Sequence, residues 1–289
     1  MLTVPRRFVE ATITREGEAG RRWIEALPEL AAGVLARWQC AMSGPVMHGF
    51  VGVVIPAIRA DGQEVVLKLG FPANTAEAVA LAAWNGNGAA RLLASDDSGA
   101  MLLERLQPLE KPASIAEIGR LARRLAIPAP RGLNSLADRA RAWMVDVPKH
   151  AARLGHPLPS RVIDACVANV RDLAVGQPDS LVHGDLHLGN VLRGGEELKA
   201  IDPSGLAGDP AYELLPVLRD DWPAVMAEAD PRRAVARRIA EFAEAAEVDR
   251  ERVHRWTQAR AAESALWSRQ LDEPDAITEL VDTIATMLV

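Results

Sequence analysis

The hydrophobic pattern of the chain changes between residues 106 and 113. Before this stretch, apolar residues form short β-branched runs between glycine-containing turns, which is typical of antiparallel strands. After it, apolar residues recur every three or four positions, which is typical of amphipathic helices. The change predicts an α+β protein with a β-rich N-terminal lobe, residues 1–106, and a mainly helical C-terminal lobe, residues 107–289.

Two hairpins are expected in the first lobe. In the first, the runs 51–56 and 64–69 flank Asp61-Gly62, and Asp-Gly between apolar runs is a strong turn signal. The second joins 89–94 to 100–106 through an Asp-Asp-Ser-Gly turn. We expect these strands to belong to one antiparallel sheet of about five strands.

Helices are expected where caps precede periodic apolar residues. Asn74, with Glu77 three residues later, begins a helix that stops at Gly86, and Ser114 with Glu117 forms a capping box at the start of another. Further helices are expected near residues 22–38, from 135 onward, and near 160–175, 231–246, 250–270 and 276–288.

Composition places the chain among soluble globular proteins. Nearly half of its 289 residues are apolar and 25% are charged, so it can bury a substantial core. The net charge of −6 argues against nucleic-acid binding and is compatible with a cationic ligand.

Two widely separated cysteines, Cys40 and Cys166, indicate reduced thiols. We find no signal peptide and no apolar run long enough to cross a membrane, so we expect a cytoplasmic enzyme without an obligate protein partner.

The densest group of chemically capable side chains is the stretch His-Gly-Asp-Leu-His-Leu-Gly-Asn at 183–190. Asp202 follows at the end of a second apolar run. Acids at the ends of short apolar strands indicate a functional cleft, because burying a charge without use is costly. The spacing His-x-Asp-x-x-x-x-Asn resembles the catalytic loop of kinases, in which Asp185 would accept the proton of the attacking hydroxyl while Asn190 and Asp202 hold Mg²⁺.

Two other interpretations of this stretch are open. Its polar residues can satisfy turn backbones, as Asn and Asp often do. Alternatively, His183, Asp185 and His187 alternate along the chain, as metal ligands on one strand of a hydrolase would. The kinase interpretation is favoured because four such residues at this spacing precede a strand-borne aspartate, and no other Cys/His cluster accompanies them.

Lys68 interrupts the apolar run 65–69, at the position of the strand lysine that contacts nucleotide phosphates in kinases. A lysine on the solvent face of a strand is the alternative. Glu77 is either the capping-box acid of its helix or the ion-pair partner of Lys68. The catalytic-loop spacing further along the chain favours the nucleotide-binding role.

Two further segments are candidates for contact with a nucleotide. Gly49 and Gly52 suit a flap over phosphates, although the chain has no Walker motif and meets the glycine-rich kinase pattern only in part. After the second hairpin, Leu103, Glu104 and Arg105 are expected to form a hinge whose backbone groups meet an adenine edge.

These motifs together resemble the aminoglycoside phosphotransferase family, and within it the branch of streptomycin 6-phosphotransferases and hydroxyurea phosphotransferases. The catalytic segment is shared with the wider protein-kinase-like superfamily. The stretch Trp-Asn-Gly-Asn-Gly-Ala-Ala-Arg-Leu-Leu at 84–93 and the stretch Ile-Asp-Pro-Ser-Gly-Leu-Ala-Gly at 201–208 point more narrowly to this branch. The similarity runs from about residue 44 to the end of the chain.

The resemblance implies a bilobal, protein-kinase-like fold that binds ATP or GTP with Mg²⁺. Carried over position by position, it implies Asp185 as catalytic base, Asn190 and Asp202 as Mg²⁺ ligands, and Lys68 on the nucleotide phosphates with Glu77 as its partner.

Two departures from related patterns matter for these roles. Ile201-Asp202-Pro203 stands where protein kinases have Asp-Phe-Gly, so no activation-loop switch is implied. The flap around Gly49 and Gly52 also lacks the serine often found there, which leaves its phosphate contacts open.

The implied acceptor is a small cationic molecule, with streptomycin first and other amines or sugars as alternatives. Each acidic residue near its expected pocket can equally be a solvated surface carboxylate. A metal-dependent hydrolase and a nucleotide-binding protein without turnover are alternatives from other classes. The acids that could line the pocket are Asp209, Glu213, Asp220, Asp221, Glu263 and Asp272.

Overall fold

The computed structural model describes residues 2–72, 74–271 and 274–289. The chain separates into two compact units, which are described one at a time. The N-terminal unit comprises Met1–Gln107 with Arg193–Glu197, and the C-terminal unit comprises Pro108–Leu192 with Leu198–Val289.

The stretch Arg193–Glu197 groups with the N-terminal unit although it lies far along the chain, which the sequence pattern does not anticipate. Gln107 and Arg193 exchange two backbone hydrogen bonds of 2.9 and 2.7 Å. This short bridge accounts for the grouping.

The N-terminal unit is built on an antiparallel sheet of six strands in the described residues, ordered β1-β3-β4-β6-β5 with β2 paired to β3. The hairpin predicted around Asp61-Gly62 is confirmed, because Ile58 lies opposite Glu64 and Gly62 has a φ of 86°. The two strands that the sequence pattern misses, β1 and β2, are only three and two residues long. The strands are β1 (Cys40–Met42), β2 (Met47–His48), β3 (Gly52–Arg59), β4 (Glu64–Gly70), β5 (Leu92–Ser95) and β6 (Met101–Glu104).

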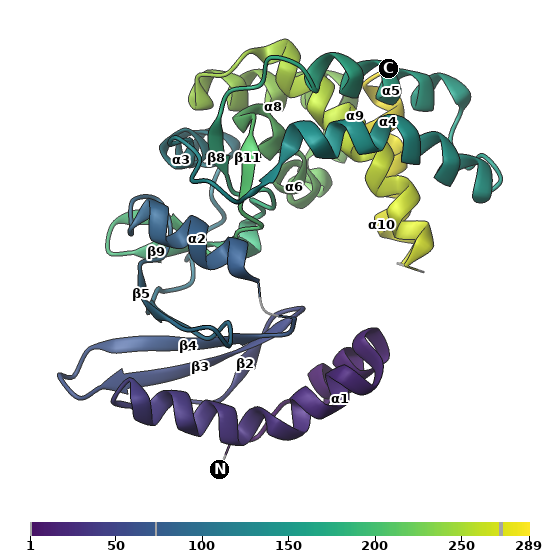
Figure 1. Cartoon of the computed structure of the whole chain (residues 1–289). Helices are drawn as coiled ribbons and strands as arrows, with labels where there is room; N and C mark the ends of the chain where they lie inside the picture. The colour runs from purple at the N-terminus through teal and green to yellow at the C-terminus, as the bar shows by residue number, and fades with distance from the viewer. Residues whose placement is uncertain (1, 73, 272–273) are drawn as a thin grey trace. The chain divides into compact units, whose positions relative to one another are not determined.

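One long helix, α1 (Arg6–Arg37), lies along this sheet (Figure 1). It begins well before the predicted residue 22, and Gly17 breaks its helical geometry with a φ of 60°. Leu27 and Val34 are fully buried in one cluster with Ile55 of β3. The helix therefore supplies part of the core that covers the sheet.

The second helix of this unit, α2 (Thr75–Trp84), has the predicted start and stop. Asn74 caps it by accepting the Glu77 N–H, and Asn85 ends it in the left-handed region. Gly86 follows with a φ of 85°, a conformation that favours glycine.

The C-terminal unit is mainly helical, as predicted. Its longest helix, α9, packs against α4, α5, α8 and α10 (Figure 1). Trp256 of α9 is fully buried, so this helix forms the centre of the core. The helices are α3 (Ile115–Leu125), α4 (Leu136–Arg153), α5 (Ser160–Leu173), α6 (Leu214–Asp220), α7 (Trp222–Met226), α8 (Pro231–Ala246), α9 (Arg250–Gln270) and α10 (Asp275–Met287).

Short strands and 3₁₀ turns frame the polar stretch 183–190. A three-stranded sheet in the order β7-β11-β8 precedes and follows it, and the β9–β10 hairpin leads to Asp202. These pieces are β7 (Asn134–Ser135), β8 (Ser180–Val182), η1 (Leu188–Asn190), β9 (Val191–Gly194), β10 (Glu197–Ala200), β11 (Leu206–Gly208) and η2 (Pro210–Glu213).

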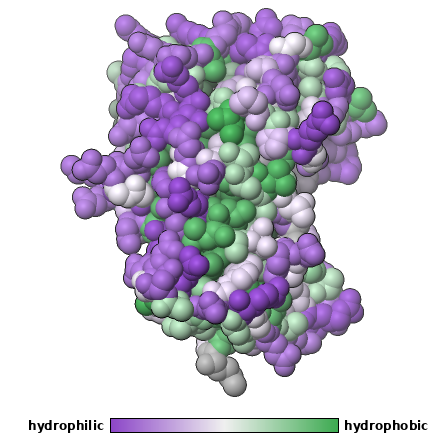
Figure 2. All heavy atoms as spheres, turned by 60° about the vertical axis from the view of Figure 1, so that its left-hand side comes forward, coloured by the Kyte–Doolittle hydropathy of each residue, from purple (hydrophilic) through white to green (hydrophobic). Residues whose placement is uncertain are grey.

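Polar and charged side chains cover most of the face drawn in Figure 2, with smaller apolar areas among them. Within the described residues, no helix combines the length and the apolar character needed to cross a bilayer. Cys40 and Cys166 are both free thiols, and burial in the core raises the pKa of Cys166 to about 12.

Candidate active site

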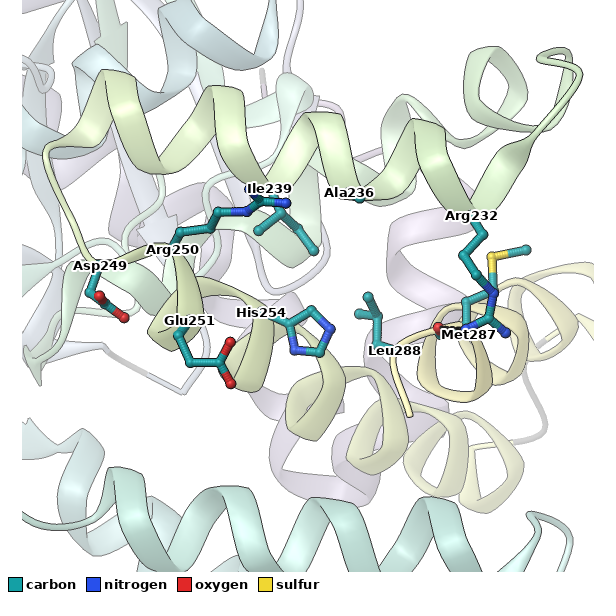
Figure 3. Close-up of a pocket in the computed structure, with 9 residues that line it drawn as sticks. All are labelled: Arg232, Ala236, Ile239, Asp249, Arg250, Glu251, His254, Met287 and Leu288. Atoms are coloured by element: carbon teal, nitrogen blue, oxygen red, sulfur yellow. Dashed lines mark hydrogen bonds between the residues drawn. The ribbon is translucent and has the colours of Figure 1, made fainter.

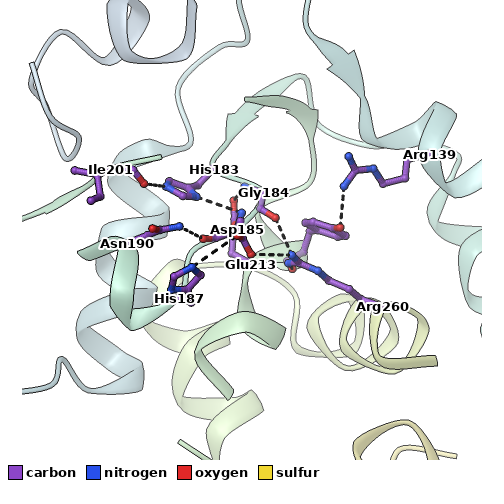
Figure 4. Close-up of polar contacts among 10 residues, drawn as sticks. Arg139, His183, Gly184, Asp185, His187, Asn190, Ile201, Glu213 and Arg260 are labelled. Carbon is purple, nitrogen blue, oxygen red and sulfur yellow. Dashed lines mark hydrogen bonds and ion pairs between the residues drawn. The ribbon is translucent and has the colours of Figure 1, made fainter. Parts of the chain in front are cut away.

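The loop between β8 and η1 presents the carboxylate of Asp185 (Figure 4). This side chain is 49% exposed, whereas the two residues before it are buried. Two cationic or potentially cationic groups flank it: Arg260 Nη2 lies 3.7 Å from Oδ1, and His187 Nε2 lies 3.8 Å from Oδ2. The carboxylate of Asp185 is therefore accessible to solvent, while the two residues that precede it in the loop are buried.

His183 fixes this loop from inside the unit. Its side chain has no exposed surface, its Nε2–H donates to the Ile201 carbonyl at 2.8 Å, and its Nδ1 accepts the Asp185 N–H at 3.2 Å. Burial lowers its pKa to about 4, so the ring is neutral at physiological pH. The hypothesis that His183 is a metal ligand is wrong, because both ring nitrogens are engaged within the protein.

Gly184 is held at both of its backbone groups. Its N–H donates to Glu213 Oε1 at 2.8 Å, and its carbonyl accepts from Arg260 Nη2 at 2.7 Å (Figure 4). Its φ is 85°, and a Cβ here would come within 3.0 Å of Ser204. Only glycine fits this conformation and this space without strain.

Glu213 is the acid beneath the loop and does not line a pocket. Its side chain is 1% exposed, and burial raises its pKa to about 7 against the opposing effects of the Gly184 N–H and Arg260. The expectation that Glu213 meets the acceptor is therefore corrected: it is a structural support for the residue before Asp185.

The backbone of Asn190 contacts the residue that precedes Asp202. The Ile201 N–H donates to the Asn190 carbonyl at 2.9 Å, which places the residue before Asp202 against the end of η1. The Asn190 side chain donates from Nδ2 to the Asp185 carbonyl at 3.0 Å, so its Oδ1 is the atom suited to a metal.

An amide oxygen and a carboxylate suit Mg²⁺, which prefers oxygen ligands and usually keeps several from water or phosphate. Asp202 has a φ of 57°, a left-handed conformation that aspartate tolerates better than most residues. No cluster of three or more His, Cys, Asp or Glu residues suited to a metal occurs in the described part of the chain. The donor set at Asn190 and Asp202 therefore fits an ion that a phosphate ligand would help to hold.

In the N-terminal unit, Lys68 and Glu77 form a buried ion pair of 2.6 Å. Their side chains are 7% and 5% exposed, so Lys68 is not on a solvent face. The Glu77 N–H donates to the side chain of Asn74 at the helix cap, and the Glu77 carboxylate accepts from Lys68. Glu77 therefore takes part in the helix cap through its backbone and is also the ion-pair partner of Lys68. Burying both charges costs desolvation free energy, which the attraction between them has to offset.

Gly49 and Gly52, which the sequence suggests as a flap over phosphates, also have a structural role within the sheet. A Cβ on Gly52 would come within 2.7 Å of the Leu69 carbonyl oxygen, so glycine is needed here for the close approach of β4. The Gly49 N–H donates to the Gly52 carbonyl and closes the turn. Arg15 of α1 donates to the Phe50 carbonyl at 3.0 Å and stacks on its ring, which steadies the tip of this turn.

The expected hinge residues divide into two groups. Leu103 pairs with Val66 and Leu92 inside the sheet, and the Glu104 N–H donates to the Arg91 carbonyl, so these two residues belong to strand β6. The hypothesis that Leu103 offers its backbone at a hinge is corrected, because the strand has not yet ended there. Arg105 follows the strand, with its guanidinium 4.0 Å from Glu64.

Two of the remaining acidic candidates are tied to structural partners. Asp209 is 2% exposed and accepts hydrogen bonds from Arg252 at 2.7 Å and from Trp256 at 3.0 Å. Asp221 pairs with Arg238 at 2.8 Å. The expectation that these acids line an acceptor pocket is therefore corrected for both.

Three acids complete the set. Asp220 is exposed and accepts the Leu188 N–H at 2.6 Å, so it supports the loop. Glu263 of α9 is partly buried, burial raises its pKa, and it makes no hydrogen bond or ion pair with another described residue. Asp272 lies outside the described residues. Glu263 is thus the acid best suited to meet a ligand.

Arg260 and Tyr212 are functional candidates that sequence reasoning missed. The Arg260 guanidinium lies 4.2 Å from the centre of the Tyr212 ring, and the Tyr212 hydroxyl accepts from Arg139 at 3.1 Å. An arginine within a helix carries no local signal of such a role. Only the packing of α9 beside the loop identifies it.

A cavity of about 610 Å³ lies elsewhere in the C-terminal unit, between α8, the start of α9 and the end of α10 (Figure 3). Three of its charged groups are engaged: Arg232 donates to the Met287 carbonyl, Asp249 caps α9, and Glu251 pairs with Arg255. Burial lowers the pKa of His254 within it. It includes none of the predicted site residues.

Comparison with known proteins identifies relatives of this chain. Streptomycin 6-kinase from Streptomyces glaucescens is 38% identical, covering 96% of each chain, and hydroxyurea phosphotransferase from Kitasatospora aureofaciens is 37% identical, covering 100% of this chain and 86% of that protein. A solved choline/ethanolamine kinase family protein from Mesorhizobium loti shares the fold, with a TM-score of 0.64 at 21% identity, over 91% of this chain and 93% of that one.

The resemblance inferred from the motifs is confirmed by a match that covers most of the sequence. Residues 37–271 match the family described as aminoglycoside/hydroxyurea antibiotic resistance kinases. The chain therefore belongs to the aminoglycoside/hydroxyurea antibiotic resistance kinase family and is a phosphotransferase with a protein-kinase-like fold.

Proposed function

We propose that this protein transfers the γ-phosphoryl group of ATP, or of GTP, to a hydroxyl group of a small cationic acceptor, with streptomycin as the first candidate. The observation that carries the proposal is the state of Asp185. Its carboxylate is 49% exposed, while the backbone before it is held by His183, Glu213 and Arg260. A carboxylate fixed in this way can orient a hydroxyl and accept its proton.

The other polar residues then serve the phosphates. Lys68, whose position is fixed by Glu77, contacts the nucleotide phosphates as a point charge. Asn190 and Asp202 hold Mg²⁺, which when bound supplies positive charge to phosphate oxygens. Because the transition state of phosphoryl transfer is loose, positioning and charge stabilisation supply most of the acceleration.

Glu263 is the proposed contact for a positive group on the acceptor. It lies three residues after Arg260 on α9, so both side chains project from the same side of the helix. Its carboxylate has no hydrogen-bond partner among the described residues and carries a raised pKa. A guanidinium or ammonium group would both pair with this carboxylate and favour its ionised form.

Hydroxyurea is a second candidate acceptor, because a relative named hydroxyurea phosphotransferase is nearly as similar as the streptomycin 6-kinases. Hydroxyurea is small and neutral, so its binding would not need Glu263. The two candidates thus make different demands on the same site. Phosphorylation of another amine or sugar is a third candidate function. For any of these acceptors, we propose that the protein works in the cytoplasm, where ATP is abundant.

The test is a panel of acceptors with γ-labelled ATP or GTP and Mg²⁺, scored for labelled product. The panel contains streptomycin, other aminoglycosides, simple amino alcohols and hydroxyurea. We expect labelled streptomycin, with the 6-hydroxyl as the site found by NMR of the product.

Labelling of hydroxyurea alone would replace the acceptor and leave the reaction type intact. If no acceptor is labelled although the protein is folded and binds Mg-ATP, the proposed function is wrong and a non-catalytic nucleotide-binding role takes its place.

A further inference from the structure

Arg260 stands 76 residues after Gly184 in the sequence, yet its guanidinium reaches the loop that carries Asp185. Only 12% of its side chain is exposed. Nη2 donates to the Gly184 carbonyl at 2.7 Å, and Nη1 donates to the Tyr212 carbonyl at 3.3 Å. The guanidinium therefore joins the catalytic loop to the turn η2.

The plane of the guanidinium is fixed by aromatic packing. It lies 4.2 Å from the centre of the Tyr212 ring, a distance typical of cation–π contact. Tyr212 is itself 3% exposed, and its ring packs edge-on against Trp256 at 5.3 Å. Arg260 therefore has little freedom to turn away from the loop.

The charge of Arg260 faces the catalytic carboxylate. Nη2 lies 3.7 Å from Asp185 Oδ1, which is beyond hydrogen-bond distance but close enough for strong attraction. The guanidinium thus attracts the carboxylate without a hydrogen bond to Oδ1. Its direct hydrogen bonds go to two main-chain carbonyls, so the contact orients the backbone as well as the side chain.

We propose that Arg260 is a positioning residue for Asp185. It holds the Gly184 carbonyl while Glu213 holds the Gly184 N–H, so the residue before the base is clamped from two directions. It also keeps a fixed positive charge beside the carboxylate. The proposal rests on the role of Asp185 given above, and it adds a residue outside the set proposed to hold the nucleotide and the metal.

The first test compares Arg260→Gln and Arg260→Lys by steady-state kinetics with streptomycin and ATP. We expect Arg260→Gln to lower kcat by about 10²-fold with little change in KM for ATP, since a misplaced base costs about this much. Arg260→Lys keeps the charge but loses the planar fork, so it should recover part of the loss. Arg269→Gln is the matched control, because Arg269 lies on α9 like Arg260 but pairs with Asp282 of α10 and makes no contact with the loop.

A second measurement does not need activity. Amide hydrogen exchange of the segment 183–190 should rise in Arg260→Gln and stay unchanged in Arg269→Gln, with circular dichroism confirming that both variants are folded. Either an unchanged kcat or an unchanged exchange in a folded Arg260→Gln protein would overturn the proposal. So would equal effects in both variants.

Failure of the proposed function is separable from failure of this inference. If the wild-type protein labels no acceptor, the function is wrong, whereas the exchange measurement still decides whether Arg260 clamps the loop. If the wild type labels streptomycin and Arg260→Gln does so equally well, Arg260 has no positioning role.

Discussion

The two polar centres of this protein are assembled in different ways. Lys68 and Glu77 lie nine residues apart on a strand and the helix that follows it. The support of Asp185 comes instead from His183 beside it, Glu213 on η2 and Arg260 on α9. The first centre is built from neighbouring elements, and the second requires several distant parts of the C-terminal unit to be folded together.

The difference has a consequence for how each centre fails. Both members of the Lys68–Glu77 pair are buried, so removing one takes the ion-pair partner from a buried charge and should affect stability. Asp185 is half exposed and is not itself a structural support, so removing it should affect chemistry alone. Mutations in the Lys68–Glu77 pair should therefore lower stability, whereas mutation of Asp185 should lower turnover.

The largest effect is expected for Asp185→Ala. Loss of the base should lower kcat by about 10²–10⁴-fold while the fold and Mg-ATP binding are retained. The measurement is turnover with streptomycin, together with calorimetric titration of Mg-ATP. Retained turnover in a verified preparation would refute the role of Asp185.

A large loss of stability is expected for Lys68→Met. Burying Glu77 without its ion-pair partner Lys68 should lower the free energy of unfolding by roughly 3–5 kcal/mol. Urea denaturation measures this, with Lys68→Met/Glu77→Leu as the control that removes both charges and should recover part of the loss. A single variant as stable as the wild type would show that the pair is not buried as described.

A pH-dependent effect is expected for Glu213→Gln. The pKa of Glu213 is raised to about 7 in the folded protein, so its contribution to stability is present below the unfolded value of 4.5 and is lost as pH rises through 7. Between pH 5 and 8, the wild type should lose about 2 kcal/mol of unfolding free energy relative to the Gln variant. Parallel stability curves for the two proteins would contradict this.

The smallest effect is expected for Glu263→Gln, which tests the acceptor side of α9. The KM for streptomycin should rise about tenfold with kcat nearly unchanged, because the contact is made equally in the ground and transition states. The KM for hydroxyurea should not change. An equal rise for both acceptors would mean that Glu263 shapes the site and does not bind a positive charge.

Local patterns in the sequence determined most of the secondary structure. The Asp61-Gly62 hairpin, the Asn74 cap and the Ser114 capping box depend on residues a few positions apart, and the structure confirms all three. The helix predicted near residues 22–38 covers only the C-terminal part of α1, which begins at Arg6 and has non-helical geometry at Gly17. The catalytic-loop motif is likewise a local spacing, so the family could be inferred from it and its flanking stretches.

Tertiary structure alone decided which charged residues face one another. Asp209, Glu213 and Glu263 look alike in sequence, yet the first two are buried with hydrogen-bond partners, whereas the third makes no hydrogen bond within the described residues. The tautomer of His183 and the place of Arg260 also follow from packing between elements far apart in the chain. Local patterns encode helices, turns and motifs because those depend on near neighbours, whereas burial and charge pairing depend on contacts that exist only once the chain has folded.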